Sequence, residues 1–312
     1  MHISQDHGPL AGDAVVRLLN TALMLDAAAD GARPARLVES KPSVRATAQA
    51  RDVAPRSVAV HPATFSWHQL HAPDPCAAAR SIARIIGADF ETRDRGLFGM
   101  TSTVLCGGLH VAGADQTDDP DRIGWEPFVR VPDVDLVCDL ALELGGSIDV
   151  APAGILGLDR RATIADPTGA RLTVIAGGDD RRTVGAGAFG WDELRSTDTQ
   201  ASLAFWSSLF GWTVARHPDR SPRRTLVLLN GGRPVAGISA CGPSEPASRW
   251  LPVATVSPRA IAAAIDHAAD RGGIVVGAGL DHPVVGRCAL VRLADGVEFL
   301  IGCDAAMALR AA

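Results

Sequence analysis

The chain has 312 residues, a length that suggests about two domains. Its net charge is −5 without a basic patch, so we expect no nucleic-acid partner. No apolar run approaches the roughly 20 residues that span a bilayer, and the N-terminus lacks a secretory pattern, so we expect no membrane partner. Six cysteines without CxxC spacing predict reduced thiols and a cytoplasmic protein.

Residues 1–60 stand outside the pattern that organises the rest of the chain. Residues 13–31 (DAVVRLLNTALMLDAAADG) predict one helix that ends at a glycine. The polar, proline-containing segment that follows is typical of a linker or a surface arm. We therefore treat residues 1–60 as an N-terminal extension.

The remainder of the chain is an internal repeat. LCGGLHVAG begins at Leu105 and LNGGRPVAG begins at Leu229, an offset of 229 − 105 = 124. The same offset places FSWHQLHAPD, from Phe65, over FGWDELRSTD, from Phe189. A repeat of this length indicates a duplicated domain. It predicts domains over residues 63–177 and 188–304, with a linker at residues 178–187.

Each copy reads as two similar halves. A half opens with a strand, and an amphipathic helix follows, begun in most halves by an aspartate such as Asp74 or Asp198. Short strands with glycine-containing turns then complete the half, so that each GG phrase is expected to be a hairpin. The order β-α-β-β-β, repeated four times, predicts the α+β class.

These motifs resemble the vicinal oxygen chelate superfamily, which includes glyoxalase I, extradiol dioxygenases and bleomycin-resistance proteins. The resemblance rests on the W-x-E-L-x-x-x-D opening, the VAG hairpins, the W-x-P strands and the DPTG turn at residues 166–169. It is nearest to the tandem-domain, hydroxylase-like branch. It implies two tandem domains, each built from paired βαβββ modules whose curved sheet forms a cup.

The resemblance also implies a divalent metal in each cup. Its ligands would be a His or Gln on the first strand of each module and a Glu on the last strand. Counting from the helix starts, the residues at these positions are Trp67, Glu126, Thr173, Trp191, Leu251 and Leu300. Indole, threonine and leucine side chains are not ordinary ligands for such cations. We therefore expect no cofactor, and a divalent metal on Glu126 with Gln69, His71 or His110 is the alternative.

The first cup carries an unusual set of polar and aromatic side chains. Alternate residues of a strand share a face, and on this phase seven side chains are expected to line the first cup. They are Trp67, Gln69, His71, Glu126, Phe128, Arg130 and Thr173.

Their chemistry suggests acid–base catalysis. His71 or Glu126 is a candidate general base, and Arg130 or Gln69 a candidate for stabilising an enolate or oxyanion. Trp67, Phe128 and Thr173 are candidate substrate contacts. The alternative is that the aromatic side chains fill the core and that His71 is exposed.

The second cup is more apolar, and Trp191, Glu193 and Arg195 are its candidate substrate contacts. The alternative is that Glu193 and Arg195 pair with each other and that Trp191 belongs to the core. This asymmetry favours an active cup in the first domain and a supporting cup in the second.

Three functional hypotheses remain open. The preferred one is a metal-independent lyase, isomerase or cyclase that acts on a small, partly apolar metabolite in secondary metabolism. The second is a non-catalytic binder of a small molecule or an antibiotic, of the resistance type. The third is a metal-dependent enzyme like a glyoxalase or a dioxygenase. In each case the partner is a small molecule, and the protein is a monomer or a homodimer.

Overall fold

The computed structural model describes residues 63–96, 99–154, 160–176, 188–215, 225–242, 245–257, 259–270 and 273–303. The N-terminal extension predicted over residues 1–60 and the linker predicted over residues 178–187 lie outside these ranges. Within them, no helix is long and apolar enough to cross a membrane.

The first domain contains two βαβββ modules in succession. The first module consists of β1 (Thr64–Ala72), α2 (Pro75–Ile86), β2 (Asp89–Asp94), β3 (Met100–Cys106) and β4 (Leu109–Gln116). A short 3-10 helix, η2 (Pro120–Arg122), leads into the second module. That module consists of β5 (Gly124–Arg130), α3 (Val134–Glu143), β6 (Ser147–Ala153), β7 (Arg161–Ala165) and β8 (Arg171–Ile175).

The second domain repeats this order. Its first module consists of β9 (Phe189–Ser196), α4 (Thr199–Phe210), β10 (Thr213–Val214), β11 (Leu226–Asn230) and β12 (Arg233–Ala240). Its second module consists of β13 (Arg249–Val256), α5 (Ile261–Asp270), β14 (Ile274–His282), β15 (Gly286–Arg292) and β16 (Glu298–Cys303). The α+β class and the fourfold βαβββ order are confirmed.

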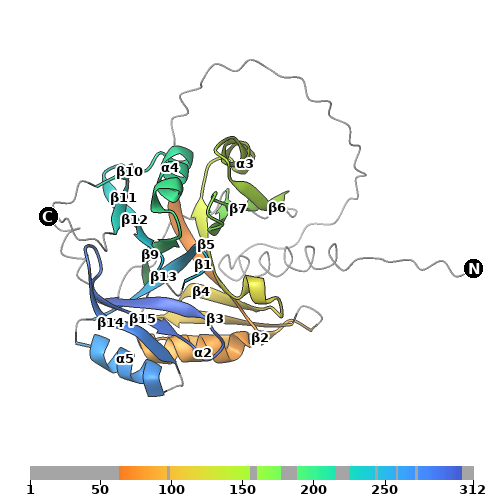
Figure 1. Cartoon of the computed structure of the whole chain (residues 1–312). Helices are drawn as coiled ribbons and strands as arrows, with labels where there is room; N and C mark the ends of the chain where they lie inside the picture. The colour runs from red at the N-terminus through yellow and green to blue at the C-terminus, as the bar shows by residue number, and fades with distance from the viewer. Residues whose placement is uncertain are drawn as a thin grey trace, which may run out of the picture.

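Each domain folds into one eight-stranded sheet (Figure 1). The strand orders are β2-β3-β4-β1-β5-β8-β7-β6 and β10-β11-β12-β9-β13-β16-β15-β14. Figure 1 labels most of these strands. The two modules of a domain meet where their first strands pair antiparallel, β1 with β5 and β9 with β13. The first strand of each module pairs in parallel with the last strand of the same module. Residues from all four strand positions therefore converge at the centre of each sheet.

The helix starts and hairpins follow the local rules that the sequence predicts. The side chains of Asp74 and Asp198 accept backbone N–H bonds from the first turns of α2 and α4, which confirms both as N-caps. A cap of this kind contributes about 1 kcal/mol. Gly107 and Gly108 both have positive φ (58° and 79°), as a two-residue primed hairpin turn requires. The repeated GG phrase is therefore a hairpin, as expected.

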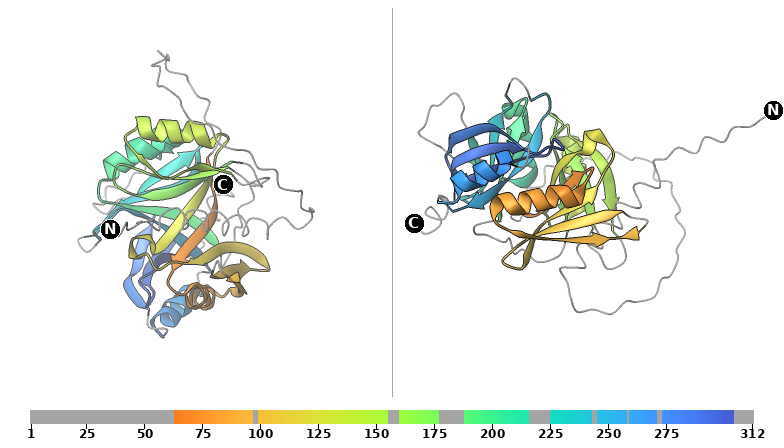
Figure 2. Two further views of the ribbon diagram at one scale, coloured as in Figure 1. Left: turned by 90° about the vertical axis from the view of Figure 1, so that its right-hand side faces the viewer. Right: turned by 90° about the horizontal axis from the view of Figure 1, so that it is seen from below.

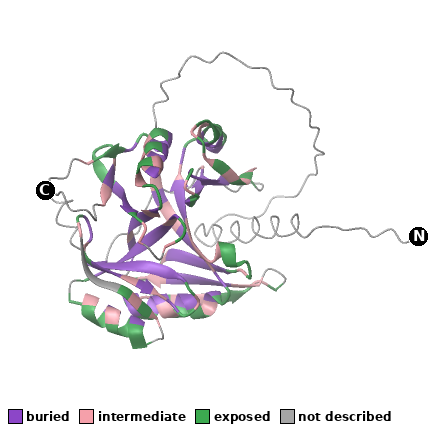
Figure 3. Cartoon of the chain, viewed as in Figure 1, coloured by how far each residue is buried: buried purple, intermediate pink, exposed green. Residues whose placement is uncertain are grey.

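The two domains pack through their helices. α3 contacts α4 at one end of the molecule, and α2 contacts α5 at the other, as two views show (Figure 2). Side chains of both domains share the resulting cores, including Phe65 from β1 and Trp206 and Trp250 from the second domain. The central strands and the inner helix faces are buried (Figure 3). The domains are thus parts of one packed body.

Two buried polar contacts fix the relation between the domains. His68 Nε2 lies 2.7 Å from Asp192 Oδ1, and the two residues are related by the repeat offset of 124. Asp166, in the DPTG turn, accepts bonds from Ser202 Oγ (2.7 Å) and Trp206 Nε1 (3.0 Å) of α4. His68 therefore lies between the two domains, in contact with its own counterpart in the repeat. No feature of the sequence predicted this position.

Candidate functional site

The central strands of the first sheet bring the predicted site residues onto one face. Gln69 is opposite Glu126 in the β1–β5 pairing, Trp67 is opposite Phe128, and Phe128 is beside Thr173 in the β5–β8 pairing. Residues paired across strands point to the same side of a sheet. We call this side the first cup and the equivalent side of the second sheet the second cup.

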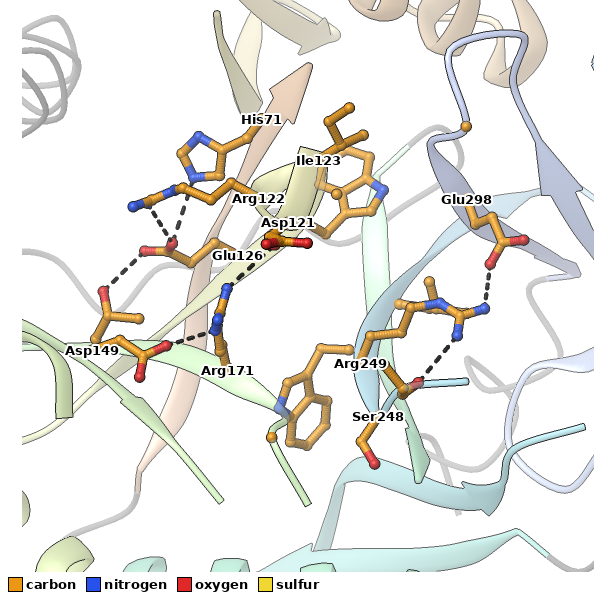
Figure 4. A pocket seen from close by; sticks show the side chains of 18 of the residues that line it. His71, Asp121, Arg122, Ile123, Glu126, Asp149, Arg171, Ser248, Arg249 and Glu298 are labelled. Carbon is orange, nitrogen blue, oxygen red and sulfur yellow. Dashed lines mark hydrogen bonds and ion pairs between the residues drawn. The ribbon is translucent and has the colours of Figure 1, made fainter. Parts of the chain in front are cut away.

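Glu126 is the centre of the polar contacts in the first cup. Its Oε1 atom accepts hydrogen bonds from the hydroxyls of Thr173 and Thr163, the latter at 3.3 Å. Its Oε2 atom faces the imidazole of His71, with Nε2 at 3.5 Å, and the guanidinium of Arg122, with Nη2 at 3.8 Å (Figure 4). The side chains of Glu126 and His71 are 16% and 15% exposed, so the pair retains access to solvent.

These contacts determine the charge of Glu126. Burial raises the pKa of the carboxyl, but the hydrogen bonds and charge of His71 and the hydroxyls of Thr173 and Thr163 lower it more. The net direction is a pKa below the ordinary value of 4.5. Glu126 is therefore ionised at neutral pH and can accept a proton.

A pocket of about 420 Å³ opens beside this pair and extends between the domains (Figure 4). Its volume is within the range of small-molecule sites. From the first domain come His71, residues 121–126, Asp149, Val150, Thr163, Gly169 and Arg171. From the second domain come residues 247–251, Gly296 and Glu298. The wall is mixed, because Trp125, Trp250 and Leu251 lie among charged side chains.

The three arginines of the pocket differ in how they are paired. Arg171 Nε lies 2.6 Å from Asp149, and Arg249 pairs with both Glu245 (2.9 Å) and Glu298. Among the described residues, Arg122 makes its ion pair only with Glu126, at 3.8 Å. Arg122 is therefore the pocket guanidinium best able to bind an oxygen of a ligand.

Sequence reasoning missed Arg122, Thr163 and the buried Asp115 of β4. Arg122 belongs to η2, directly before the W-x-P strand, and a basic residue in such a loop carries no positional signal. Asp115 could have been found, because β4 pairs in parallel with β1 and Asp115 is opposite His71. Burial raises the pKa of Asp115, against the opposing charges of His71 and Arg95.

Arg130 is not brought to Glu126, and its role in stabilising an oxyanion stays a prediction. The two lie four residues apart on β5, about 13 Å at the usual rise per residue. Arg130 is not among the residues that line the pocket. His110 pairs with Glu91 at 3.5 Å beside the β3–β4 hairpin and does not contact Glu126.

The remaining candidates of the first cup lie deeper than the pocket. Trp67 Nε1 donates to Gln69 Oε1 at 2.9 Å. Gln69 and Phe128 are 1% and 2% exposed. Gly113 of β4 leaves room for Gln69, since a Cβ there would lie 2.4 Å from Gln69 Oε1. Substrate contact by Trp67 and Phe128 stays a prediction.

The second cup also contains a carboxylate, Glu193. Three of its described donors are side chains of the strands that form the same cup. Glu193 accepts from Trp191 Nε1 (3.2 Å), Ser239 Oγ and His282 Nε2 (3.1 Å). His282 Nδ1 accepts the backbone N–H groups of Val284 and Val285, each at 3.1 Å. The ring proton is therefore on Nε2, where it is donated to Glu193.

The predicted alternative pairing of Glu193 with Arg195 is wrong. Arg195 instead binds Glu245, with Nε to Oε1 at 3.3 Å, and also Ser239 at 3.3 Å. The reason is that the β14–β15 hairpin supplies His282 to Glu193, while the segment before β13 supplies Glu245 to Arg195. Trp191 is 2% exposed and packs in the core of this cup.

The β14–β15 hairpin also fills the second cup. Val284 and Val285 belong to one apolar cluster with Trp191, Leu251 and Leu300. Each of these five side chains is at most 8% exposed. The second cup therefore has an occupied apolar interior, whereas the first cup has a polar interior that meets the pocket.

The donor sets do not fit the metal that the fold resemblance implies. At the central strand positions the first cup offers Gln69, Glu126 and Thr173, and the second cup offers Glu193 with leucines. In the described ranges, no group of three or more His, Cys, Asp or Glu side chains is placed to hold a metal ion. At these central positions each cup has a single carboxylate, and Asp115 of the first cup lies on β4, which is not adjacent to the β5 strand of Glu126. This is a poor set for a hard or borderline divalent cation.

Comparison with known proteins shows which proteins share this fold. Residues 188–299 match the Glyoxalase/Bleomycin resistance protein/Dioxygenase superfamily. The Mn(II)-bound glyoxalase of Novosphingobium aromaticivorans superposes with a TM-score of 0.56 at 13% identity, over 78% of this chain and 82% of that one. The 2,3-dioxygenase LapB of Pseudomonas sp. KL28 gives a TM-score of 0.55 at 12% identity, over 78% of this chain and 93% of that one. The second domain therefore matches the superfamily model, and the chain as a whole shares the fold of these two enzymes.

Two sequence relatives share more residues with the chain. A Mycobacterium tuberculosis (strain CDC 1551 / Oshkosh) protein, provisionally named as the glyoxylase CFP32, is 27% identical over 76% of this chain and 94% of its own length. The anthracycline biosynthesis protein DnrV of Streptomyces peucetius is 28% identical over 58% of this chain and 72% of its own length. The chain is similar to both across the two domains.

Proposed function

We propose that the protein is an enzyme that moves protons on a small, partly apolar metabolite, without a metal, in the first cup. The observation that carries this proposal is the convergence of His71 and Arg122 on one oxygen of an ionised Glu126 at the edge of the pocket. A base, an acid and a cation within reach of one ligand are the components of metal-free isomerisation or elimination.

Glu126 is the proposed base. Its Oε1 atom is held by two threonine hydroxyls, so Oε2 is the atom oriented toward the pocket side. The low pKa of the carboxyl keeps it ionised, and removal of the water around it on substrate binding would strengthen it as a base. It would take a proton from a carbon next to a carbonyl group.

Arg122 and His71 complete the proton balance. The guanidinium of Arg122 would stabilise the enolate oxygen that develops when the C–H bond breaks. His71, 3.5 Å from Glu126, would act as the acid: it would give its Nε2 proton to a different atom of the substrate and then take the abstracted proton from Glu126. The net reaction is an isomerisation if the proton returns to carbon, or an elimination if it goes to a leaving oxygen.

The relatives support a role in secondary metabolism. One relative is named for anthracycline biosynthesis, and another is provisionally named as a glyoxylase. The pocket wall contains Trp125, Trp250, Ile123 and Leu251, which suits a partly apolar substrate. We infer a carbonyl metabolite of this kind as the substrate.

The test is hydrogen exchange in heavy water with a panel of enolisable aromatic and aliphatic ketones. NMR would follow deuterium incorporation next to the carbonyl, and tryptophan fluorescence would measure ligand affinity. We expect Glu126→Gln to abolish exchange and to retain binding. If the substitution changes affinity alone and the wild-type protein exchanges nothing that it binds, the protein is a binder and the proposal fails.

The metal-free part has its own test. Protein purified without chelator is analysed for bound elements, and its thermal midpoint is measured with added Mn²⁺, Zn²⁺, Fe²⁺ and Ni²⁺. We expect less than a stoichiometric amount of any of them and no shift of the midpoint. About one equivalent of a single metal, with stabilisation when it is added back, would make Glu126 a ligand and overturn this part.

A further inference from the structure

The interior of the first cup contains polar atoms that neither the pocket nor the proposed chemistry uses. They belong to Gln69 on β1, Asp115 on β4 and Arg95 just after β2, a group that we call the inner cup. Gln69 and Asp115 are 1% and 7% exposed. They lie on neighbouring strands and on the same face, since Gln69 pairs with Gly113 and His71 pairs with Asp115. The inner cup therefore borders His71, which is paired with Asp115 across β1 and β4.

Several of these buried atoms lack a partner within the described part of the chain. They are Gln69 Nε2, Asp115 Oδ1, and Nε and Nη2 of Arg95. A buried polar atom without a hydrogen bond costs about 1–3 kcal/mol. Nearly all such atoms in native proteins bind protein, water or a ligand. Several in one place indicate a group that the protein itself does not supply.

The orientation of the Gln69 amide is fixed by chemistry. The Trp67 indole N–H can only donate, so the amide atom 2.9 Å from it must be the oxygen. The NH2 end of Gln69 therefore points away from Trp67 and acts as a donor. Asp115 Oδ1 is an acceptor on the next strand. Gln69 and Asp115 thus present a donor and an acceptor, and the guanidinium of Arg95 adds further donors.

The second cup shows what these two positions do when the protein satisfies them. Adding the repeat offset of 124 to 69 and to 115 gives Glu193 and Ser239, and the Ser239 hydroxyl donates directly to Glu193. In the first cup the same positions hold Gln69 and Asp115, and one polar atom of each remains unpaired. In the second cup, the Ser239 hydroxyl hydrogen-bonds the side chain at the partner position. In the first cup, no hydroxyl group of the described residues fills this role between Gln69 and Asp115.

We propose that the inner cup is a binding site for a hydroxyl group, whose oxygen accepts the N–H of Gln69 and whose hydrogen is donated to Asp115. Water and a substrate hydroxyl share this chemistry. The site rests on the proposed function in one respect, because a substrate hydroxyl here would place the neighbouring carbons beside His71 and Glu126. The substrate class is then a hydroxylated carbonyl compound.

Crystallography of the full chain tests the site directly. Crystals grown without polyols should show an ordered oxygen within hydrogen-bond distance of both Gln69 Nε2 and Asp115 Oδ1. A soak in ethane-1,2-diol then separates the two sources. A diol oxygen at that position assigns the site to organic hydroxyls, and an unchanged oxygen assigns it to water. Either outcome supports the hydroxyl site. A direct bond between the two side chains, or no oxygen between them, overturns it.

Two matched variants sharpen the result. Gln69→Leu removes the donor at nearly constant volume, and we expect the bridging oxygen to disappear. Ser239→Ala changes the equivalent position of the second cup and should leave that oxygen in place. If the oxygen persists in Gln69→Leu, the donor assignment is wrong. The wild-type measurement stands even if a variant fails to fold.

These readouts do not depend on turnover. An ordered hydroxyl without hydrogen exchange would leave the site standing and would overturn the proposed reaction. Exchange without an ordered hydroxyl would do the opposite. The two proposals can therefore fail separately.

Discussion

The two cups are built from equivalent central strands of the two sheets, but their side chains differ. In the first, Glu126 on β5 is held on one oxygen by threonines, and its other oxygen faces His71 and Arg122 at 3.5 and 3.8 Å beside a pocket. In the second, Glu193 on β9 has all its described donors inside the protein, and valines of a hairpin occupy the space around it. A buried carboxylate is thus available for chemistry only where its surroundings leave one oxygen incompletely bonded.

The difference also explains why the pocket lies between the domains. Val284 and Val285 occupy the second cup, so this side contributes only the start of β13 and β16 to the pocket wall. The first domain contributes His71 and Glu126. The two copies therefore differ in that one fills its cup with packed apolar side chains and the other borders the pocket with polar groups.

Exchanging the carboxylate of the first cup for an amide should have the largest effect. Glu126→Gln is expected to lower the rate of substrate hydrogen exchange by about 10²–10⁴-fold, the usual contribution of a general base. Because the pKa of Glu126 lies below 4.5, the wild-type rate should fall on the acidic side only below that pH. A rate–pH profile of both proteins measures this, and an acidic limb near neutrality would contradict the assignment.

Glu193→Gln is the matched control in the second cup. It should leave the exchange rate within about twofold, because Glu193 does not border the pocket. An equal loss of rate in both variants would mean that the cups do not differ as proposed.

Among the substitutions considered, Glu193→Gln should cause the largest loss in the free energy of unfolding. In Glu193→Gln, the amide NH2 either faces both donors of Oε2, Trp191 and His282, or replaces Oε1 beside the Ser239 hydroxyl, and all the hydrogen bonds lose their charged acceptor. We therefore expect a loss of about 2–3 kcal/mol in the free energy of unfolding. Burial raises the pKa of Glu193, but His282, Ser239 and Trp191 lower it more, to below 4.5.

The sign of the pH dependence follows from this shift. A carboxyl whose folded pKa is lowered stabilises fully above its unfolded value and loses that contribution as pH falls through the folded pKa. Urea unfolding should therefore show a constant difference between wild type and Glu193→Gln above pH 4.5 and a shrinking one below it. A difference that grows on acidification would contradict the internal hydrogen bonding of Glu193.

The hairpin that fills the second cup should contribute less. Val285 is 2% exposed, and Val285→Ala removes two methyl groups from a packed cluster. We expect a loss of about 1–2 kcal/mol from transfer and cavity terms. Thermal unfolding measures it, with Val214→Ala, on the exposed strand β10, as the control expected to change little. No loss at Val285 would mean that the hairpin does not seal this cup.

The sequence was sufficient for the fold because the repeat preserves local signals. Asp74 and Asp198 start helices, and paired glycines make hairpins, through interactions within a few residues. The strand phase also placed Gln69 and Glu126 on one face, and in the structure they are opposite each other. These features depend on backbone geometry, which residue order determines directly.

The site was predictable only in part, because its contacts cross between elements. His71 and Glu126 were named from one strand phase, but their distance depends on the β1–β5 register. Arg122 approaches from a loop, and His282 reaches Glu193 across 89 residues, as the hairpin folds back. Side chains delivered by loops follow no periodicity, so the pairing of Glu193 with Arg195 was a reasonable expectation from spacing and still wrong.

The smallest effect should come from substituting Arg130. Comparing it with Arg122 decides which arginine acts on the substrate: Arg122, as the structure suggests, or Arg130, as the sequence predicts. Arg122→Gln should lower the exchange rate by about 10-fold or more, since it removes the cation nearest Glu126 Oε2. Arg130→Gln should change it by less than about twofold, because Arg130 lies outside the pocket wall. Both rates are measured at saturating substrate and normalised to folded protein. Equal losses would restore Arg130 as a group that acts on the substrate, and would require the ligand to reach along β5 into the far end of the first cup.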